Sequence, residues 1–331
     1  MSPDRISLQA RHESWSIEGS FTISRGSKTT ADVIVVEVSR GQHRGRGECV
    51  PYPRYHETVH GVLATVEQLH PALEDAFTRE HLQQLLPAGA ARNAVDCALW
   101  DLESRESGKP VWQLAGLPAP APVSTAYTIS LGTPETMGLA ARQNRHRPLL
   151  KLKLTGDGDL ERVAAIRQSA PAAALIVDAN ESWSVNQLES VGASLAEQGV
   201  ALIEQPLPAG ADEALASCHH PVPICADESC HTRADVAALA NRYDVVNIKL
   251  DKTGGLTEAL ALQANASSCG LGIMIGCMVS TSLSMAAAFV LTSGADFVDL
   301  DGPLLLRRDR EHGLQYVESL IHPPVPQLWG G

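Results

Sequence analysis

The sequence predicts an α/β protein in which a closed (β/α)8-type barrel follows an α+β domain. Short apolar segments recur along the last two thirds of the chain at intervals of about one strand plus one helix, and most end in Lys, Asp or Glu. One residue from each segment after the first gives the series Lys153, Asp178, Glu204, Asp227, Lys249, Ile275 and Asp299, with gaps of 25, 26, 23, 22, 26 and 24 residues. This spacing is typical of a (β/α)8 barrel, whose reactive side chains gather at the C-terminal ends of the strands.

The balance of charged residues limits the classes of partner. The chain has 331 residues, with 26 Lys and Arg against 38 Asp and Glu, so its formal net charge is −12. This excess argues against nucleic acid and anionic membranes as partners, because both repel an acidic surface. No apolar run follows a basic start, and nowhere are there 18 consecutive apolar residues, so we expect neither a signal peptide nor a membrane span. The expected compartment is the cytoplasm, and the oligomeric state stays open, a homo-oligomer included.

The cysteines fit the same compartment. There are seven of them, an odd number without a CxxC pair, which favours reduced thiols over a disulfide framework. Cys225, Cys230 and His231 could be part of a zinc site, but no second close pair completes four ligands. We therefore expect small buried thiols at these positions.

The part of the chain before about residue 120 predicts a separate α+β domain. Residues 33–38 (VIVVEV) form a strand-like run, and residues 57–69 and 90–102 have the apolar spacing of helices. The proline-rich linker at residues 117–122 is stiff and cannot continue a helix. We expect a capping domain over residues 1–118, the barrel over 119–305, and a C-terminal segment over 306–331 that returns to the cap.

The remainder of the chain alternates between strand-like and helix-like segments. Amphipathic stretches such as residues 160–168 and 234–240 lie between most of the short apolar runs. Alternation of this kind predicts parallel strands, and eight strands predict a closed barrel. The expected strands are residues 123–129, 149–154, 174–178, 201–204, 224–227, 244–250, 271–275 and 297–301.

The polar side chains at the strand ends can be assigned to faces, because successive residues of a strand point to opposite sides. Three pairs of residues two apart share a face: Lys151 with Lys153, Asn247 with Lys249, and Asp299 with Asp301. Any one of these charges could be a solvated strand end. The whole set is harder to explain that way, because charged side chains seldom lie on the inner faces of apolar strands without partners.

Three carboxylates should converge at the mouth of the barrel. Asp178, Glu204 and Asp227 come from three successive strands, and three hard anionic oxygens without His or Cys nearby suit Mg²⁺ better than zinc or iron. Without a cation the carboxylates would repel one another, and at least one would stay protonated. The sequence therefore predicts a Mg²⁺ site formed by these three residues.

Two lysines should flank that metal site. Lys153 on the second strand and Lys249 on the sixth lie four strands apart, on opposite sides of an eight-stranded ring. Two bases on either side of one carbon can remove a proton from one face and deliver a proton to the other, which inverts the stereocentre. We expect Mg²⁺ and Lys151 to lower the pKa of the lysine that acts as the base. The same positive charges would stabilise the enolate.

At this point the residues resemble a known family. The motif Lys151-Leu-Lys153, the three carboxylates and Lys249 look like the enolase superfamily, in its muconate-lactonising subgroup. From about residue 21 to residue 303 the chain is also similar to the L-Ala-D/L-Glu epimerases, the dipeptide epimerases of that subgroup. The segments that carry this similarity are GRGECVPYPRY (45–55), LPAGAARNAVDCALWDL (86–102), VDANESW (177–183), EQPLP (204–208), ICADESCHT (224–232), NIKLDKTGGLTEAL (247–260) and DLDGP (299–303).

The resemblance implies an enolase-like fold and a class of substrate. In these epimerases the two DxD carboxylates bind the ammonium group of a dipeptide and the metal holds its C-terminal carboxylate, so Asp299 and Asp301 take the first role here. The implied reaction is the epimerisation of the C-terminal residue, L-Ala-D-Glu to L-Ala-L-Glu, in the recycling of cell-wall peptides. An N-acylamino-acid racemase is disfavoured, because an acylated substrate has no ammonium to pair with two buried aspartates.

The side-chain carboxylate of that substrate needs a cation of its own. Arg25 in the cap segment FTISRGSKT (21–29) is the candidate, with Gly26 as the hinge that lets the loop close and exclude water. The alternative is an exposed surface arginine. Thr128, on the inner face of the first strand, is a candidate for bonding the peptide group.

Three further polar residues lie near the expected site. Asn180 and Glu228 lie one or two residues beyond metal ligands, and we expect them to orient those ligands rather than bind the metal. Lys252 is a rival to Lys249 as the base, but it lies past the strand in a turn that contains two glycines. We therefore favour Lys249.

Two other classes of function stay open. One is another proton-abstracting enzyme of the superfamily, such as a cycloisomerase or an o-succinylbenzoate synthase, although neither substrate carries an ammonium group for the DxD motif. The other is a non-catalytic, metal-dependent binding protein in which the lysines only neutralise the carboxylates.

Overall fold

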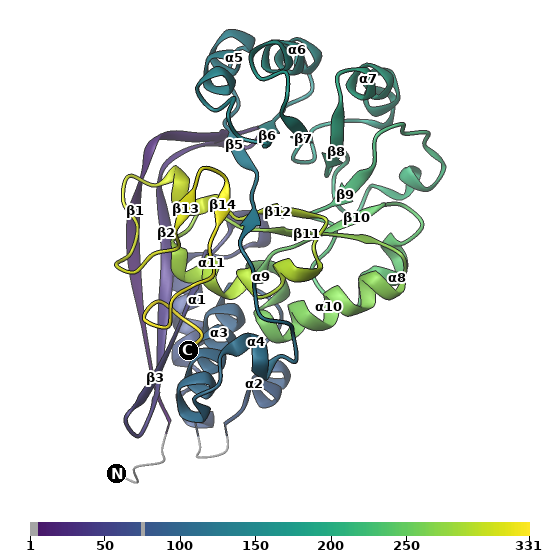
Figure 1. Cartoon of the computed structure of the whole chain (residues 1–331). Helices are drawn as coiled ribbons and strands as arrows, with labels where there is room; N and C mark the ends of the chain where they lie inside the picture. Colours follow the sequence, from purple (N-terminus) through teal and green to yellow (C-terminus); the bar gives the residue numbers. More distant parts are fainter. Residues whose placement is uncertain (1–5, 74–76) are drawn as a thin grey trace.

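The chain folds as an antiparallel sheet with helices, followed by a barrel of parallel strands (Figure 1). The computed structural model describes residues 6–73 and 77–331. The first sheet consists of β1 (Ser7–Ile23), β2 (Gly26–Arg40) and β3 (His43–Cys49), in that order. The helices of this part are α1 (Val59–Glu67), α2 (Arg79–Leu85), α3 (Ala90–Ser107) and the short α4 (Val111–Leu114).

The first predicted helix is shorter than expected at its N-terminus, because Glu57 has another role. The carboxylate of Glu57 accepts hydrogen bonds from the backbone N–H groups of Ala90 at 2.7 Å and Tyr52 at 3.0 Å. It therefore supplies an acceptor to the N–H of Ala90, which has no partner within the first turn of α3. Thr58 takes the N-cap position of α1, where its hydroxyl accepts from Gly61 N.

The barrel contains eight parallel strands in sequential order, which confirms the predicted fold class. A backbone hydrogen bond of 2.8 Å from Ala126 N to Val298 O joins the first strand to the last and closes the ring. The strands are β5 (Tyr127–Ile129), β6 (Leu149–Lys153), β7 (Ala174–Asp178), β8 (Val200–Glu204), β9 (Ile224–Ala226), β10 (Val245–Ile248), β11 (Gly272–Gly276) and β12 (Phe297–Asp299).

Helices follow most of these strands but not all of them. After β8 the chain forms only a 3₁₀ turn, Glu213–Ser217, in a segment where prolines before and after the turn remove backbone donors and restrict the chain. After β12 only the turn Gly302–Leu305 follows. The helices around the barrel are α5 (Pro134–Gln143), α6 (Asp159–Ser169), α7 (Val185–Glu197), α8 (Val236–Leu239), α9 (Leu250–Thr253), α10 (Leu256–Ser268) and α11 (Ser282–Phe289).

The inside of the barrel has two layers of side chains. The predicted metal ligands Asp178, Glu204 and Asp227 each lie two residues beyond a member of the lower layer, so they share its inner face but stand nearer the C-terminal mouth. The lower layer is apolar and contains Ile176, Leu202, Cys225, Val245 and Met274. Cys225 is thus part of an apolar floor, in line with the expectation of buried thiols.

The C-terminal residues contact the first part of the chain. After β12 the chain forms β13 (Tyr316–Val317) and β14 (Leu320–Ile321), and β14 pairs with β4 (Val123–Ser124). The indole N–H of Trp329 then donates to Cys97 O at 3.1 Å, and Gly330 N donates to the carboxylate of Asp101 at 2.9 Å. Both partners belong to α3, beside which the C-terminus lies in Figure 1. The domain limits given above stay our proposal.

Helix α3 approaches strand β3 closely enough to require glycine. A Cβ atom on Gly47 would stand 2.1 Å from Ala94 O and 2.8 Å from Ala98 N, and both atoms belong to the helix backbone. The helix cannot yield at a single point, because α3 is buried along most of its length.

The variant Gly47→Ala is therefore expected to lower the free energy of unfolding by about 1–3 kcal/mol through overpacking. Denaturant unfolding measures this change. The matched control is Gly61→Ala on the exposed side of α1, where the nearest side-chain atom to the added Cβ is Thr58 Oγ1 at 3.1 Å. A Gly47→Ala protein as stable as the control would contradict the close-packing argument.

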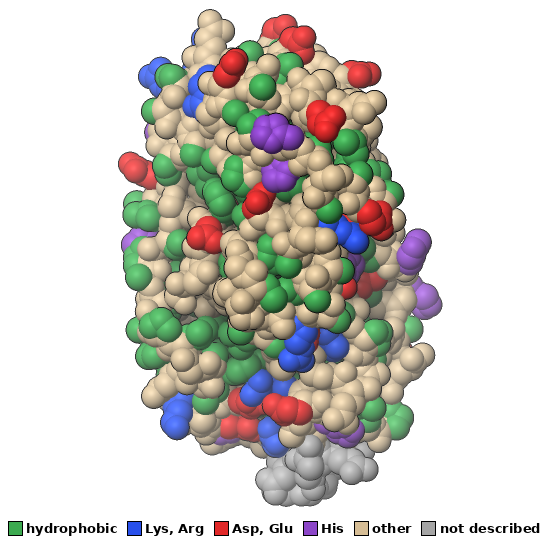
Figure 2. Space-filling model, turned by 90° about the vertical axis from the view of Figure 1, so that its right-hand side faces the viewer, with side chains coloured by type: hydrophobic (Ala, Val, Ile, Leu, Met, Phe, Trp, Pro, Cys, Tyr) green, Lys and Arg blue, Asp and Glu red, His purple; other side chains and the backbone are tan. Residues whose placement is uncertain are grey.

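The surface carries mixed charges. On the face in Figure 2, Lys and Arg side chains lie among Asp and Glu side chains rather than forming a continuous basic surface. Within the part of the chain that the structure describes, no helix is both long and apolar enough to cross a bilayer.

Candidate active site

Strand β6 places two lysines inside the barrel. The ammonium of Lys153 lies 2.6 Å from Asp178 Oδ2, on the neighbouring strand β7. The ammonium of Lys151 lies 2.6 Å from Glu204 Oε2 and 2.7 Å from Asp299 Oδ2. All five side chains are buried, so the charges of the two lysines are balanced by carboxylates rather than by water.

A second lysine centre lies on the other side of the ring, just beyond β9 and β10. The ammonium of Lys249 is 2.6 Å from Asp227 Oδ2. Lys252, on α9, is 2.7 Å from Asp227 Oδ1 and also donates to Asn247 O at 2.8 Å. Only Lys249 of these two lines the cavity that also contains Lys153, which supports the choice of Lys249 over Lys252.

That cavity has a volume of about 740 Å³ and lies between the barrel mouth and the first part of the chain. Its barrel wall includes Lys151, Asp227 and Glu228, and its cap wall includes the β1–β2 hairpin and the loop after β3. Of the predicted site residues, the lining includes Arg25, Thr128, Lys151, Lys153, Asp227, Lys249, Asp299 and Asp301. The fold thus brings residues from both parts of the chain together around one space.

The three predicted metal ligands carry one anchored oxygen each. Asp178 Oδ1 accepts from Asn180 N at 2.9 Å, Glu204 Oε1 accepts from Asn247 Nδ2 at 2.8 Å, and Asp227 Oδ1 is held by Lys252. The other oxygen of each carboxylate meets only lysines of the site. Within the described ranges no group of three His, Cys, Asp or Glu side chains is arranged to hold a metal ion, and the ammonium of Lys151 lies within 3.5 Å of both Asp178 and Glu204.

Burial and neighbouring charges act in opposite directions on the pKa values of these carboxylates. Burial raises the pKa of Glu204, and the neighbouring Asp178 raises it further against the opposing effect of Lys151. Burial would also raise the pKa of Asp227, but Lys249 and Lys252 hold it well below the usual range. Three buried carboxylates with one anchored oxygen each fit a small divalent cation, which prefers such hard oxygen ligands.

The DxD motif forms a second acidic centre. Asp301 Oδ2 accepts a hydrogen bond from Thr128 N at 2.6 Å, and burial together with Asp299 raises the pKa of Asp301 to about 7. Asp299 Oδ1 is buried and has no hydrogen-bond partner among the described residues. Two buried carboxylates with an unpartnered oxygen beside a cavity can accept a cationic group. Thr128 contacts Asp301 through its backbone, so its predicted contact with a peptide group stays a prediction.

Arg25 extends from the β1–β2 hairpin into the cavity but already has acidic partners. Its guanidinium donates to Glu228 at 2.7 Å, to Asn180 O at 2.9 Å and to Glu181 at 3.2 Å. These bonds tie the hairpin to the ends of the barrel strands. A substrate carboxylate would compete with Glu228 for the guanidinium of Arg25. The expected contact of Arg25 with that carboxylate stays a prediction.

Lys28 was not singled out from the sequence. It lines the same cavity three residues beyond Arg25, and its ammonium lies 5.8 Å from the centre of the Phe21 ring, as does that of Lys153. Burial lowers the pKa of Lys28 even though Asp32 opposes the shift. The sequence did show a second cation in FTISRGSKT that could have indicated a site residue. The hairpin register that turns Lys28 inward is not visible in the sequence.

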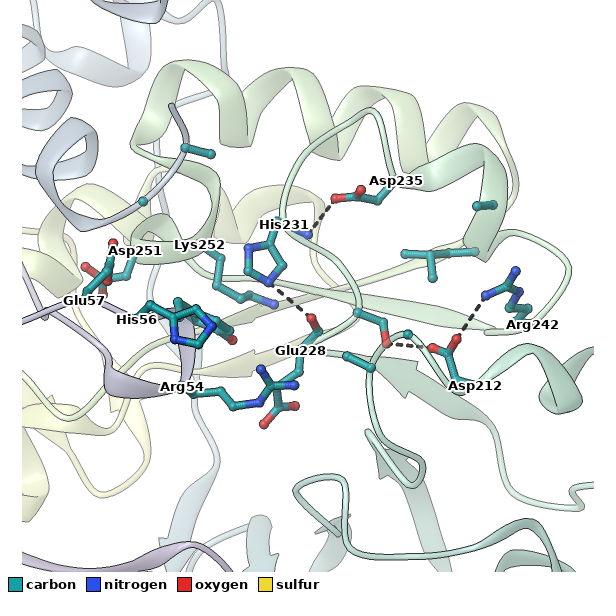
Figure 3. Close-up of a pocket in the computed structure, with 18 residues that line it drawn as sticks. Arg54, His56, Glu57, Asp212, Glu228, His231, Asp235, Arg242, Asp251 and Lys252 are labelled. Atoms are coloured by element: carbon teal, nitrogen blue, oxygen red, sulfur yellow. Dashed lines mark hydrogen bonds and ion pairs between the residues drawn. The ribbon is translucent and has the colours of Figure 1, made fainter. Parts of the chain in front are cut away.

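A second, polar cavity of about 600 Å³ lies behind Glu228 and Lys252. Figure 3 shows these two side chains beside His231, whose Nε2 lies 3.2 Å from Glu228 O. Arg242 at the far end of this cavity is paired with Asp212 at 3.0 Å. Glu228 lines both cavities and binds Arg25, and its expected role beside the metal ligands stays a prediction.

Comparison with known proteins places this geometry in a family. The family model for the mandelate racemase/muconate lactonizing enzyme N-terminal domain matches residues 5–116, and the model described as enolase C-terminal domain-like matches residues 137–324. The chain belongs to the mandelate racemase/muconate lactonizing enzyme family of the enolase superfamily. This confirms the resemblance seen in the sequence.

Two curated relatives of the chain have names that specify glutamate derivatives as substrates. The L-Ala-D/L-Glu epimerase of Escherichia coli K12 is 49% identical over 312 residues, which cover 94% of this chain and 97% of the relative. An N-acetyl-D-glutamate racemase of a Pseudoalteromonas species is 45% identical over 303 residues, covering 90% and 95%. The second relative is named for an N-acetylated substrate, so an N-acylamino-acid racemase is again an alternative.

Solved structures of the family have the same fold. One is an enolase family member from Agrobacterium tumefaciens with homology to dipeptide epimerases, solved with sodium, L-Ala-L-Glu and an ordered loop. It is 52% identical, with a TM-score of 0.96 and coverage of 98% of this chain and 100% of that chain. A dipeptide epimerase from Enterococcus faecalis V583, complexed with Mg and L-Leu-L-Tyr, is 28% identical, with a TM-score of 0.91 and coverage of 98% for both chains.

Proposed function

We propose that the protein is an isomerase that inverts the Cα of the C-terminal residue of a dipeptide, with L-Ala-D-Glu and L-Ala-L-Glu as its substrate pair. One observation carries this proposal. Lys153 and Lys249 belong to strands on opposite sides of the ring, each pairs with a different carboxylate of the triad, and both line one cavity. The named activities of the relatives support the same reaction class.

Mg²⁺ is the proposed cofactor, held by Asp178, Glu204 and Asp227. Each of these buried carboxylates has one oxygen that meets only lysines of the site, which supports this assignment, as do family structures complexed with Mg. When bound, the cation supplies positive charge that stabilises the negative charge developing on the substrate carboxylate. Lys151, buried between Glu204 and Asp299, adds a fixed positive charge beside the reacting carbon.

Lys153 and Lys249 are the proposed acid and base. One removes the Cα proton while the other, still protonated, donates to the opposite face, and the roles exchange for the reverse reaction. Burial by itself would lower the pKa of Lys249, but Asp227 and Glu204 outweigh burial and raise it. Lys151 opposes this rise, in the direction expected from the sequence. A neutral Lys249 therefore requires that the charge of its carboxylate partners be compensated by another cation.

The two ends of the substrate need separate contacts. We assign Asp299 and Asp301 to the ammonium group, because both are buried carboxylates that line the cavity, and Asp299 Oδ1 has no hydrogen-bond partner among the described residues. The side-chain carboxylate is assigned to the β1–β2 hairpin, where Arg25 and Lys28 line the cavity. Thr128 is kept as the candidate for the peptide group. We place the reaction in the cytoplasm, in the recycling of cell-wall peptides. All seven cysteines are free thiols, which fits a reducing compartment.

The test is incubation of the purified protein with Mg²⁺ and L-Ala-D-Glu in D2O. NMR follows the Glu Cα proton, and chiral analysis follows the product. Loss of that proton with formation of L-Ala-L-Glu is the expected result, and it excludes a non-catalytic binding protein. No exchange with this or any other dipeptide would overturn the substrate assignment.

A second candidate is racemisation of N-acetylglutamate, favoured by the name of the relative that is 45% identical. Both substrates present a glutamate Cα, but only the dipeptide carries an ammonium group. Comparison of kcat/KM for L-Ala-D-Glu and N-acetyl-D-glutamate decides between them. If Asp299 and Asp301 bind ammonium, Asp301→Asn should weaken turnover of the dipeptide more than turnover of the acetylated amino acid.

The two hairpin cations are separable by mutation. Lys28→Met is expected to lower kcat/KM for L-Ala-D-Glu about 10- to 100-fold, since it removes a cation beside the substrate's side-chain carboxylate. It should change the value for L-Ala-D-Gln much less. Arg25→Met tests the other cation in the same way. A loss of equal size for both dipeptides would show that the mutated residue stabilises the hairpin instead of recognising the carboxylate.

A further inference from the structure

We infer that Gln205 is a positioning residue that sets the geometry of Asp227 from behind the site. The inference rests on the proposed role of Asp227 as a metal ligand and deepens it. Gln205 directly follows Glu204 and is fully buried. Its side chain reaches from the end of β8 to the chain that leaves β9, so it links two of the three predicted ligands.

The amide oxygen of Gln205 holds the segment that carries Asp227. Oε1 accepts hydrogen bonds from Asp227 N at 2.8 Å and from Ser229 N at 3.1 Å. β9 ends at Ala226, so these two N–H groups lie beyond the strand. A side-chain oxygen therefore takes the place of a strand partner for the residues just past the sheet.

The amide nitrogen of Gln205 fixes the orientation of the oxygen. Nε2 donates to Leu207 O at 2.8 Å, to Ser229 Oγ at 2.9 Å and to the Tyr243 hydroxyl at 3.0 Å. A flipped amide would direct its N–H groups at two backbone N–H groups and its oxygen at a carbonyl, so only one orientation is compatible. Asp212 completes the network by accepting from Tyr243 and Ser229, both at 2.6 Å.

The backbone of Gln205 is itself held in an unusual conformation. Its φ is +37°, in a region that residues other than glycine seldom adopt. Gln205 N donates to Cys225 O at 2.8 Å, and Gln205 O accepts from Glu181 N at 2.9 Å. The loops after β7, β8 and β9 are thus joined at this one residue. A strained backbone conformation persists only where surrounding contacts enforce it, and such positions cluster at functional sites.

These contacts give Asp227 a defined position before any metal binds. Gln205 fixes its backbone, while Lys249 and Lys252 hold its two carboxylate oxygens. Without the Gln205 oxygen, two N–H groups next to the metal ligand would lose their acceptor. Groups that orient metal ligands typically change metal affinity about 10- to 100-fold when they are removed.

The test compares Mg²⁺ binding by substrate-free wild-type protein and Gln205→Asn, measured by isothermal titration calorimetry. Asn tolerates a left-handed backbone but is one methylene shorter, so the backbone is preserved and the reach to Asp227 N is lost. The expected result is Mg²⁺ binding about 10- to 100-fold weaker. If Gln205→Asn fails to fold, Gln205→Met, which matches the length of Gln, replaces it.

Asn93→Leu is the matched control for general destabilisation. Asn93 is another fully buried amide, but its Nδ2 donates to Asp251 Oδ1 at 2.9 Å and Glu48 O at 3.4 Å and to none of the three predicted metal ligands. It should lower the melting temperature without changing Mg²⁺ affinity. Wild-type affinity in Gln205→Asn or Gln205→Met would overturn the inference. The calorimetric measurement contains no substrate, so it tests the role of Gln205 separately from the proposed reaction. Wild-type protein that binds Mg²⁺ but epimerises no dipeptide would contradict only the substrate assignment.

Discussion

Lys249→Ala is expected to abolish net epimerisation of L-Ala-D-Glu, and Lys153→Ala is expected to do the same, with losses of about 10³-fold or more. Each lysine acts as acid in one direction and as base in the other, and a positioned acid or base contributes typically 10²- to 10⁴-fold. The remaining lysine can still exchange a proton on its own face of Cα. Each variant should therefore incorporate deuterium into one epimer only, and the two variants should select opposite epimers. NMR in D2O on each pure epimer measures this directly.

The matched control for these variants is Lys109→Ala, because Lys109 is an exposed lysine outside the cavity. Its exchange and epimerisation rates should equal those of the wild type. Undiminished exchange from both epimers in Lys153→Ala or Lys249→Ala would contradict the assignment of the two bases. Such a result for Lys249 would direct attention to Lys252, which shares the carboxylate of Asp227.

Arg310→Met is expected to lower the free energy of unfolding by about 3–5 kcal/mol, because it leaves a buried carboxylate without its cation. Glu48 on β3 is fully buried, and its Oε2 accepts from Arg310 Nη2 at 2.5 Å. Its remaining partners are the N–H of Thr281 at 2.8 Å and the hydroxyl of Thr281 at 2.5 Å. Glu48 therefore links the first sheet, the barrel and the C-terminal segment. Denaturant unfolding of the variant measures the loss.

The loss should depend on pH in a defined direction. Burial raises the pKa of Glu48 despite the opposing effect of Arg310, and removal of the arginine raises it further. A carboxyl group whose pKa is raised by folding binds its proton more tightly in the folded state, so stability falls as the pH rises through that pKa. The deficit of Arg310→Met should therefore shrink as the pH is lowered. The double variant Glu48→Gln, Arg310→Met should recover part of the lost stability at neutral pH, and a deficit that grew at low pH would contradict this account.

The barrel and its charged residues were predictable because both follow a simple period. Strands recur about every 25 residues, and the alternation of faces within a strand places Lys151 beside Lys153 on the inside. The apolar residue two positions before each acidic residue, such as Ile176 before Asp178, is part of the same signal. Sequence periodicity therefore determines which side chains enter the barrel and at which end they lie.

Contacts between distant segments were not predictable in the same way. Arg25 was expected to reach the substrate carboxylate, but its bonds to Glu228 and Glu181 depend on how the hairpin docks on the barrel. The network around Gln205 depends on a left-handed backbone at a residue that is not glycine, for which the sequence has no local marker. The absence of an α-helix between β8 and β9 was indicated in the sequence only by the prolines of that segment.

The proposed reacting groups and the proposed side-chain contacts lie in different parts of the chain, which bears on how enzymes of this kind acquire new substrates. The proposed proton-transfer and metal groups lie at the ends of barrel strands, whereas Arg25 and Lys28 come from a hairpin more than 120 residues earlier in the sequence. Mutations in that hairpin can alter which side chain is accepted while the reacting groups stay on the barrel, because none of those groups belongs to the hairpin. A library restricted to residues 21–30 should therefore yield altered dipeptide preference at little cost in chemical rate. Evolution could proceed by the same route, keeping one reaction while exchanging its substrates.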